Sequence, residues 1–227
     1  MSNWVLVPIK RSEQAKSRLS PLLDREERQA LVHAMARDVF GALTEASSIA
    51  GVGVVSPDAE ILRDANALGF HAIPDLEEIG YAAAVARGVA ALSMKGATDV
   101  LAIPGDLPLL TARDIDHLVE AHRGARFTII SSRDGKGTNG LMQRLPAKVP
   151  FLYGNESYSR HIAAAGSLGI SANVVFSKNL ALDIDYPEDV QAFLSVERET
   201  ATRAALLSMP TVLSSYVGNF RERMLSA

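Results

Sequence analysis

The chain has 227 residues, of which 48% are hydrophobic and 22% charged, and its formal net charge is −3. This composition is typical of a globular protein with one large domain or two small ones, and the negative charge argues against a general nucleic-acid binder. The lack of cysteine excludes disulfides, thiolate metal sites and a cysteine nucleophile. The sequence contains neither a signal-peptide pattern nor an apolar run near the ~18 residues of a membrane span, so we expect a cytoplasmic protein.

A basic segment follows the first predicted strand, residues 4–9. Lys10, Arg11, Lys16 and Arg18 lie close together here with a single acid, Glu13. Arginine and lysine side chains at the end of a strand suit a small anionic ligand, and the planar arginine group matches phosphate oxygens. A solvated basic loop is the alternative interpretation. Because the glycine-rich P-loop pattern is absent, side chains would have to hold the phosphate groups.

Strands and helices are expected to alternate through the first half of the chain. Asp24 and Glu27 have the spacing of a capping box, and Leu31 begins a run of apolar residues at four-residue intervals. Short apolar runs predict further strands at residues 50–56, 70–74, 98–103 and 126–132. Helical patterns occupy residues 59–69, 80–94 and 112–123.

The second half of the sequence is less regular. We expect a glycine-rich loop at residues 133–142, then a short strand, a turn and a helix within residues 151–166. Further strands are predicted at residues 170–176 and 180–184, and a helix at residues 187–199. The alternation indicates an α/β fold with a mostly parallel sheet and helices on both faces. Ligands of such sheets bind beyond the carboxyl ends of the strands.

The last segment, residues 209–227, is predicted to form an additional helix. Val212, Tyr216 and Phe220 would share one face of this helix. That face could pack on its own domain or form the contact of a homodimer. We therefore divide the chain into a domain of residues 1–208 and a C-terminal helical extension of residues 209–227.

Three acidic residues have the placement expected of metal ligands. Asp106 follows an apolar strand between two prolines, and Asp183 and Asp185 lie two apart in a segment expected to be extended. Side chains two apart in a strand share a face, and a divalent cation would neutralise their repulsion. Mg²⁺ prefers such hard oxygen ligands. We interpret Asp189 as structural, because an acid in the first turn of a helix is favoured by the helix dipole.

Two further segments offer groups for an anionic ligand. The stretch from Asp134 to Leu141 contains three glycines, with Thr138 and Asn139 as hydrogen-bonding residues. A mobile hairpin loop is the alternative for this stretch.

The second segment precedes the helix within residues 151–166. Gly154 and Ser157 lie at the start of that helix, where free backbone amides and hydroxyl groups can bind an anion. His161 falls four residues after Ser157 on the same helical face, where it could equally have only a structural role.

Taken in order, these segments resemble one known family. The sequence reads Pro8-x-Lys10, "AKSRLS", "PGDLPLL", "GKGTNGL", "YGNESYSRH" and "LDIDYPED". This order is similar to the guanylyltransferases of coenzyme F420 biosynthesis, which use 2-phospho-L-lactate, phosphoenolpyruvate or 3-phosphoglycerate. The resemblance covers roughly residues 4–195. It implies a Rossmann-like nucleotidyltransferase fold of the GT-A type.

The resemblance also implies roles for individual residues. The protein would transfer GMP from GTP to a phosphorylated three-carbon acid and release pyrophosphate, with Mg²⁺ as cofactor. The implied nucleotide-binding residues are Lys10, Lys16, Arg18 and Gly80. Lys16, Arg18 and Asp106 are the implied catalytic residues, and Asp106, Asp183 and Asp185 the implied metal ligands. The acid would be held by Thr138, Gly154, Ser157 and His161.

The sequence departs from the family pattern at Gly80-Tyr81-Ala82, where family members often read Gly-Leu-Asn. The asparagine side chain is therefore missing beside the expected nucleotide. Two alternatives to the implied activity remain. One is another nucleotidyltransferase of the same fold, although the glycine-rich N-terminal signature of sugar-phosphate enzymes is absent. The other is a non-catalytic nucleotide-binding protein.

Overall fold

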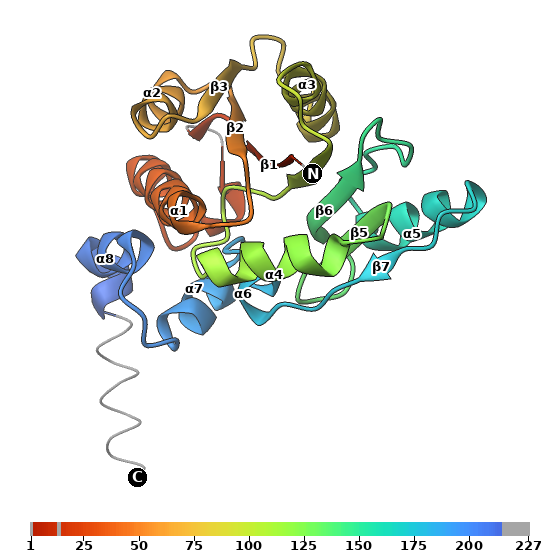
Figure 1. Ribbon diagram of the computed structural model, residues 1–227. Coiled ribbons are helices and arrows are strands. Elements are labelled where there is room, and N and C mark those ends of the chain that lie inside the picture. Colours follow the sequence, from red (N-terminus) through yellow and green to blue (C-terminus); the bar gives the residue numbers. More distant parts are fainter. Residues whose placement is uncertain (1, 13–14, 215–227) are drawn as a thin grey trace.

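The computed structural model describes residues 2–12 and 15–214, which contain one seven-stranded sheet (Figure 1). The strand order is β3-β2-β1-β4-β6-β5-β7. Neighbouring strands pair in parallel, except that β6 is antiparallel to both β4 and β5. The mostly parallel sheet predicted from the sequence is confirmed. The strands are β1 (Asn3–Pro8), β2 (Gly51–Ser56), β3 (His71–Pro74), β4 (Asp99–Ala102), β5 (Phe127–Ser131), β6 (Thr138–Arg144) and β7 (Asn173–Val174).

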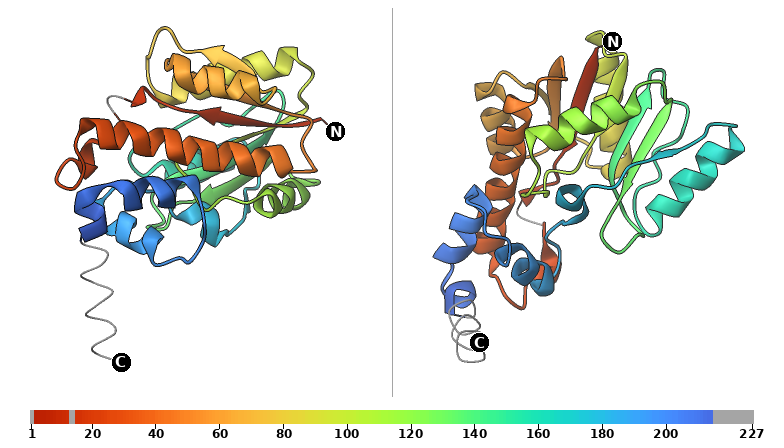
Figure 2. Two further views of the ribbon diagram at one scale, coloured as in Figure 1. Left: turned by 90° about the vertical axis from the view of Figure 1, so that its left-hand side faces the viewer. Right: turned by 60° about the horizontal axis from the view of Figure 1, so that its bottom comes forward.

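Helices cover both faces of the sheet, as expected (Figures 1 and 2). On one face α3 (Tyr81–Met94) and α5 (Ser157–Ser167) pack against the strands. The other face is covered by α1 (Arg25–Glu45), α2 (Ala59–Ala67), α4 (Ala112–His122), α6 (Lys178–Ala181), α7 (Pro187–Leu194) and α8 (Ala201–Ser208). A short 3₁₀ helix, η2 (Ser17–Leu19), lies between β1 and α1.

The alternation of side chains along β1 explains why both faces are covered. Val5 and Val7 belong to the core on the α1 side, whereas Leu6 packs with Val85 and Leu92 of α3 on the opposite side. Successive residues of a strand point to opposite faces, so a fully apolar strand needs a partner layer on each side. Burying each of these large side chains contributes about 1.5–3 kcal/mol.

The start of α1 confirms the predicted capping box. Glu27 N donates to Asp24 Oδ1 at 2.8 Å, and Asp24 N donates to Glu27 Oε2 at 2.9 Å. Each bond satisfies a backbone amide that the helix itself leaves without a partner. The four residues predicted to form the apolar face of the helix are all buried, namely Leu31, Met35, Val39 and Leu43.

Several predicted elements differ in the structure. The strand expected at residues 180–184 is wrong, because α6 occupies Lys178–Ala181 and begins where Ser177 Oγ accepts from Leu180 N at 3.3 Å. The segment 151–153 is not a strand, and the strand expected at 170–176 is only β7, Asn173–Val174. The glycine-rich loop expected at 133–142 ends at β6, which begins at Thr138.

The C-terminal region also departs from the expected pattern. Helix α7 ends at Leu194 rather than at residue 199, and it is followed by the unpredicted helix α8. The N-terminus of α8 is held by Asp38 of α1, whose carboxylate accepts from Ala201 N and Thr202 N at 2.7 and 2.8 Å. Residues 210–214 are helical, and Val212 is buried in the main core. The remainder of the helix predicted at 209–227, with Tyr216 and Phe220, lies outside the described residues.

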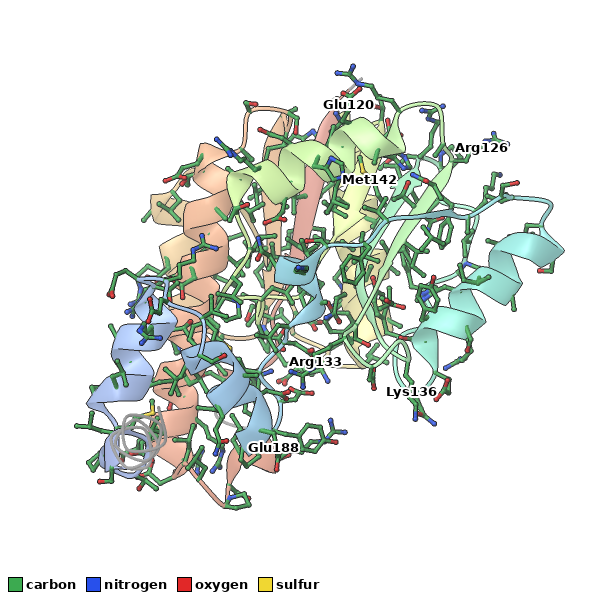
Figure 3. The ribbon with its side chains drawn as sticks, turned by 90° about the horizontal axis from the view of Figure 1, so that it is seen from below. Glu120, Arg126, Arg133, Lys136, Met142 and Glu188 are labelled. Atoms are coloured by element: carbon green, nitrogen blue, oxygen red, sulfur yellow. The ribbon has the colours of Figure 1, made fainter. Side chains whose placement is uncertain are left out.

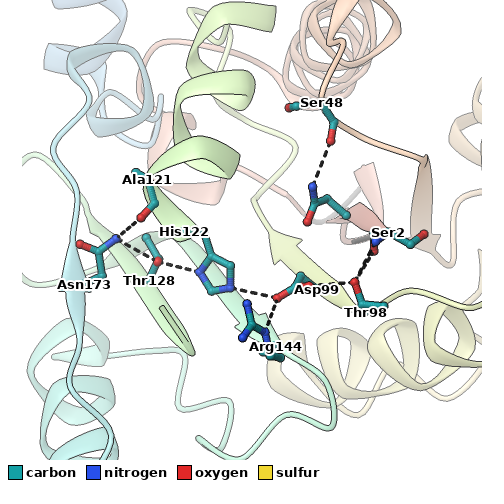
Figure 4. Close-up of polar contacts among 10 residues, drawn as sticks. Ser2, Ser48, Thr98, Asp99, Ala121, His122, Thr128, Arg144 and Asn173 are labelled. Carbon is teal, nitrogen blue, oxygen red and sulfur yellow. Dashed lines mark hydrogen bonds and ion pairs between the residues drawn. The ribbon is translucent and has the colours of Figure 1, made fainter. Parts of the chain in front are cut away.

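A buried polar network joins the strands at the amino end of β4 (Figure 4). The Asp99 carboxylate accepts from Arg144 Nε at 3.2 Å and pairs with His122 Nε2 at 3.3 Å. Burial holds the pKa of His122 below its usual value despite the opposing effect of Asp99. His122 Nδ1 lies 2.7 Å from the hydroxyl of Thr128 on β5. This network stabilises the amino ends of the central strands, opposite to the loops at the carboxyl ends of the parallel strands.

Candidate active site

The loops at the carboxyl ends of the parallel strands surround a cleft of about 970 Å³. Its walls come from the loops after β1, β4 and β5, the start of α5, and the loop between α6 and α7. Because β6 runs antiparallel to β4, its first residues also lie at this edge. The placement agrees with the rule that open α/β sheets bind ligands at this end.

Lys16 is the cation at the centre of the predicted acidic cluster. Its Nζ donates to Asp106 Oδ2 at 2.6 Å and to Asp185 Oδ1 at 2.7 Å, and its side chain is only 7% exposed. The backbone at Lys16 is left-handed, with φ 56° and ψ 36°. A non-glycine residue in this region costs about 1 kcal/mol, so the contacts of its side chain must hold it there.

The charges of this group reinforce one another. Burial alone would lower the pKa of Lys16, but Asp106 and Asp185 raise it above its usual value. Burial would raise the pKa of Asp185, but the charge and hydrogen bond of Lys16, with help from Arg18, hold it below its usual value. Arg18 Nη1 lies 3.3 Å from Asp185 Oδ2, and its guanidinium lies 5.0 Å from the Tyr186 ring centre. The exposed Arg18 therefore lies at the rim, while Lys16 is buried.

Asp183 completes the acidic cluster, but its pKa is raised whereas the pKa of Asp185 is lowered. Burial, together with the negative charges of Asp106 and Asp185, raises the pKa of Asp183 to about 6. Lys16 opposes this rise only in part. The site thus holds a third carboxylate whose charge the neighbouring side chains do not neutralise. A carboxyl group in this state favours the arrival of another cation.

The three aspartates have the donor atoms that a hard divalent cation prefers, since all are carboxylate oxygens. As they stand, no three acidic or histidine side chains in the described part of the chain are grouped to hold a metal ion. Lys16 Nζ lies between two of them, Asp106 and Asp185. A metal ion would therefore share or replace the position of this ammonium group. The residues present fit Mg²⁺ on condition that Lys16 can move.

The β1 and β4 loops approach closely beside this cluster. A Cβ atom on Gly105 would lie 2.5 Å from Ile9 Cγ1, so only glycine fits here without displacing Ile9. The close approach brings Asp106 alongside the segment that carries Lys10 and Lys16. Lys10 is exposed, with Nζ 6.0 Å from the centre of the Tyr81 ring. The structure thus places Lys10 at the same cleft as Lys16 and Asp106.

A second cavity of about 360 Å³ adjoins the first and shares Lys10 and Tyr81 as lining residues. Its far wall contains an ion pair between Arg11 and Glu78, which joins the β1 loop to the loop before α3. Gly80, the residue before α3, has φ 130°, a conformation that L side chains rarely adopt. The predicted nucleotide-binding glycine thus lines this second cavity.

Behind the residues that line the main cleft, three predicted residues form a buried hydrogen-bonded chain. Leu152 N donates to His161 Nε2 at 2.8 Å, so this ring nitrogen is the acceptor. The neutral ring then carries its proton on Nδ1, which lies 3.1 Å from Thr138 Oγ1. Ser157 Oγ lies 3.1 Å from the same Thr138 oxygen.

Burial lowers the pKa of His161 to about 4, so its ring is neutral near pH 7. All three side chains of this chain are buried, and His161 has no exposed surface. Gly154, by contrast, is exposed and lines the cleft. The structure therefore places Gly154 at the cleft, whereas Thr138, Ser157 and His161 lie behind its lining residues.

The sequence did not predict a role in the site for Tyr153 or for the ring of Tyr81. The rings of Tyr81 and Tyr153 are in edge-to-face contact, with their centroids 4.7 Å apart. The centroids of the Tyr153 and His161 rings are 5.3 Å apart. This aromatic row connects the two cavities to the hydroxyl chain. Burial, with smaller effects of Tyr153 and Asp106, raises the pKa of Tyr81 well above its usual value. The tyrosines are isolated in the sequence, and the alternation of predicted strands and helices gave no indication that they form this aromatic row.

Asp189 has a larger structural role than its position in the helix suggested. Its Oδ2 accepts from Asp185 N at 3.1 Å and Tyr186 N at 2.8 Å, while Oδ1 accepts from Arg133 Nη2 at 2.5 Å. Asp189 therefore fixes the backbone that presents Asp185 to Lys16. Its position in the first turn of a predicted helix was the only sequence feature that pointed to it.

Comparison with known proteins identifies the family. A family model described as "Guanylyl transferase CofC like" matches residues 3–216. The chain belongs to this family. A phosphoenolpyruvate guanylyltransferase of Chloroflexus aggregans is 37% identical over 86% of this chain and 98% of its own length. A 3-phospho-D-glycerate guanylyltransferase of Phenylobacterium zucineum is 39% identical over 77% and 82% of the two chains.

A solved structure supports the fold independently. A putative nucleotide-diphospho-sugar transferase from Desulfovibrio desulfuricans superposes with a TM-score of 0.77 at 14% identity, covering 95% of this chain and 99% of its own. The predicted nucleotidyltransferase fold is therefore confirmed, and membership of the family makes this CofC-like protein a guanylyltransferase. Within residues 2–12 and 15–214, no helix has the length and apolar character needed to cross a membrane.

Proposed function

We propose that this CofC-like protein transfers GMP from GTP to a phosphorylated three-carbon acid and releases pyrophosphate in coenzyme F420 biosynthesis. The acids considered are phosphoenolpyruvate, 2-phospho-L-lactate and 3-phosphoglycerate. The printed names of relatives support two of these, phosphoenolpyruvate and 3-phospho-D-glycerate. The relatives thus support the reaction class more strongly than a single acceptor.

One observation carries this proposal, namely the position of Lys16 between Asp106 and Asp185 at the floor of the cleft. The triphosphate of GTP bears about four negative charges near neutral pH and the acid about three, so a site for both needs several cations. Lys16, Arg18 and Lys10 supply positive charge along one wall. Stabilising charge in a water-poor cleft is the main means by which phosphoryl and nucleotidyl transfer is accelerated.

In the transfer step, an oxygen of the acid's phosphate group forms a bond to the α-phosphorus of GTP. The bond from that phosphorus to the β-phosphate bridging oxygen breaks, and pyrophosphate leaves with the electron pair. The attacking oxygen is already ionised near pH 7, so the step requires no general base. This agrees with the buried, neutral His161, which supports hydroxyl groups and has no exposed surface.

We include Mg²⁺ as cofactor, held by Asp106, Asp183 and Asp185. When bound, Mg²⁺ would supply charge neutralisation for the phosphate oxygens of both substrates. Lys16 would then exchange its two carboxylates for phosphate oxygens. The raised pKa of Asp183 supports this assignment, because the acidic cluster carries more negative charge than Lys16 compensates.

The second cavity is the place for the base and ribose of the nucleotide. It adjoins the cations through Lys10 and Tyr81, and it is open at Gly80, which has no side chain. Arg11 and Glu78 on this wall are a donor and an acceptor paired with each other, so guanine would have to exchange with this ion pair, and the asparagine usual in the family is missing. Guanine offers acceptors at O6 and N7 and donors at N1 and N2, which match these two groups.

The decisive experiment is a pyrophosphate-release assay with a mixture of the three acids, repeated with GTP, ATP, CTP and UTP separately. The expected result is release only with GTP and Mg²⁺ together with an acid, with a diphosphate-linked product found by mass spectrometry. A parallel assay replaces the acids by a sugar phosphate, and pyrophosphate release there with CTP would indicate another nucleotidyltransferase. Nucleotide binding without any pyrophosphate release would indicate a non-catalytic protein.

A further inference from the structure

Two cations that the proposed reaction does not yet use lie on the wall opposite Lys16. Arg133 and Lys136 occupy the hairpin between β5 and β6, and both are exposed and line the main cleft. Figure 3 shows Arg133 and Lys136 at the same end of the molecule as Glu188, whereas Arg126, at the other end of β5, lies far from them. The hairpin thus adds two cations to a wall that also carries the carboxylates of Asp134 and Glu156.

A backbone hydrogen bond and an ion pair fix these two cations between the hydroxyl chain and the acidic cluster. Tyr158 N donates to Lys136 O at 3.0 Å, which ties the hairpin to the start of α5 beside the Thr138 and Ser157 hydroxyls. The Arg133 guanidinium is held by Asp189, which also binds the backbone of Asp185. The two cations therefore flank the space between the hydroxyl chain and the acidic cluster, where the acid substrate must lie to reach the nucleotide.

The acidic residues on this wall, Asp134 and Glu156, differ in how far they neutralise the positive charge of Arg133 and Lys136. The Asp134 carboxylate is turned into its own loop, where Oδ1 accepts from Ser132 Oγ at 2.5 Å and from Lys136 N at 3.0 Å. These hydrogen bonds to Ser132 and the Lys136 backbone hold the pKa of Asp134 below its usual value. Glu156 is exposed at the start of α5. Arg133 Nη2 is already paired with Asp189 Oδ1, but 54% of the Arg133 side chain is exposed. The hairpin therefore presents Lys136 and the exposed part of Arg133 to the cleft.

We propose that Arg133 and Lys136 bind the carboxylate of the acceptor and so select phosphorylated acids over phosphorylated alcohols and sugars. This inference rests on the proposed function. In the transfer step only the phosphate of the acceptor reacts, and its carboxylate stays ionised beside two phosphate-rich groups. An ionised carboxylate in such a place needs a cation of its own. Lys136 and the nitrogens of Arg133 other than the Nη2 held by Asp189 can donate to it.

The test compares each acid with an analogue in which a methyl group replaces the carboxylate. For 2-phospho-L-lactate this analogue is isopropyl phosphate. The measurement is kcat/KM with GTP and Mg²⁺ for wild type, Arg133→Gln, Arg133→Lys and Lys136→Gln, with Arg126→Gln as the matched control. Calorimetric binding of each acid provides a second readout that does not depend on turnover.

Arg133→Gln and Lys136→Gln are expected to reduce the preference for the acid over its analogue by about 10- to 100-fold, the size of one hydrogen bond between charged groups. In Lys136→Gln, use of the analogue and the KM for GTP should change little. In Arg133→Gln, use of the acid and of the analogue should both fall, because the variant also releases Asp189, so the comparison there is the ratio of the two. Arg133→Lys should recover part of the preference, and Arg126→Gln should match wild type. An equal loss for acid and analogue, or an unchanged preference in both variants, would overturn the inference. Failure of the wild type with every acid would instead refute the proposed function itself.

Discussion

Lys16 Nζ lies 2.6 Å from Asp106 Oδ2, although 90 residues separate the two in sequence. One residue follows β1 and the other follows β4, and these strands are neighbours in the sheet. The contact is therefore a direct result of the parallel pairing, which brings the ends of both strands to one edge. A buried ammonium with two carboxylate partners has a high cost of removal, because its loss leaves the acids facing one another.

Replacement of Lys16 by methionine is expected to lower kcat/KM for GTP by about 100- to 1,000-fold, the usual loss when one preorganised charge is removed from a transfer site. The KM for GTP should rise more than kcat falls if Lys16 binds the triphosphate in the ground state. Steady-state kinetics at fixed acid concentration measure both. Lys148→Met is the control, because Lys148 is exposed and does not line the cleft. Equal kinetics in the two variants would remove Lys16 from the catalytic site.

Asp183→Asn is expected to stabilise the metal-free protein while abolishing turnover. The pKa of Asp183 is about 6 in the folded state and near 3.8 in an ordinary setting, so the folded state holds this proton more tightly. That contribution to stability is complete below about pH 4 and is lost as the pH rises through 6. Asparagine should therefore add about 1–3 kcal/mol to the free energy of unfolding at pH 8 and little at pH 4.

Urea denaturation with EDTA at the two pH values measures the effect of Asp183→Asn. Asp64→Asn is a suitable control, because Asp64 lies on α2 and lines neither cavity. A variant that is destabilised at pH 8 would show that the charge of Asp183 is not repelled in the folded state.

His161 is expected to stay neutral from pH 9 down to about pH 5, since burial lowers its pKa to about 4. The unfolded chain takes up this proton near pH 6.5. Stability should therefore fall as the pH decreases from about 6.5 to 4 and then level off. The ring proton chemical shifts of His161, assigned by comparison with a His161→Gln sample, measure the titration directly. A midpoint near 6.5 would contradict the burial described above.

Two replacements of His161 separate its two hydrogen bonds. Asparagine can place a donor near the Nδ1 position and keep the contact with Thr138, whereas glutamine reaches the Nε2 position and keeps the contact with Leu152 N. The KM for the acid should rise about tenfold in His161→Gln, the value of one hydrogen bond, and change less in His161→Asn. If both variants raise the KM equally, while thermal unfolding shows equal destabilisation, His161 would have only a packing role.

Gly80→Ala is expected to raise the KM for GTP and to lower stability by about 1 kcal/mol. Space is not the reason, since a Cβ at Gly80 would meet nothing within 4 Å, but its φ of 130° disfavours any L side chain. Gly41→Ala in α1 provides a matched control, because its added Cβ is equally unhindered and its helical position should make the variant more stable. Thermal unfolding and GTP kinetics on both variants measure the effect. An equally stable Gly80→Ala protein would show that this backbone conformation is not required.

The regular part of the fold could be predicted because local patterns and tertiary structure agree there. The apolar strands β1 to β5 and the capping box of α1 are examples. The strand predicted at residues 180–184 was wrong. The apolar pattern of these residues suits a buried strand, but Ser177 starts a single helical turn instead. Helix α8 had no local indication of its N-terminal partner, because Asp38 lies 163 residues earlier in the sequence.

The candidate site was predictable to the extent that strand ends mark the cleft. Lys16 and Asp106 could be expected at the same end of the sheet from the order of strands and loops alone. Asp185 was expected there at the end of a strand that the structure does not contain, and α7 positions it instead through Asp189. The loop of residues 133–140 could be expected at the same cleft, because it also follows a predicted strand, and it does line the cleft. A binding role for Arg133 and Lys136 could not be expected, because nothing in a basic pair on a glycine-rich loop indicates a ligand. The cavity that they line depends on β6 running antiparallel, and the sequence pattern of residues 133–142 did not reveal that strand.

The reversed direction of β6 makes the hairpin tip, residues 132–137, a small module carried by two neighbouring strands. Its length and side chains can change without altering the sheet register or the cations after β1, while Arg133 alone connects the described tip through Asp189 to the acidic cluster. If the tip binds the acceptor as proposed, relatives that share this scaffold would acquire a different acceptor by exchanging a few of its residues. Grafting this tip between two family members is consequently a direct route to reprogramming which small molecule receives the nucleotide.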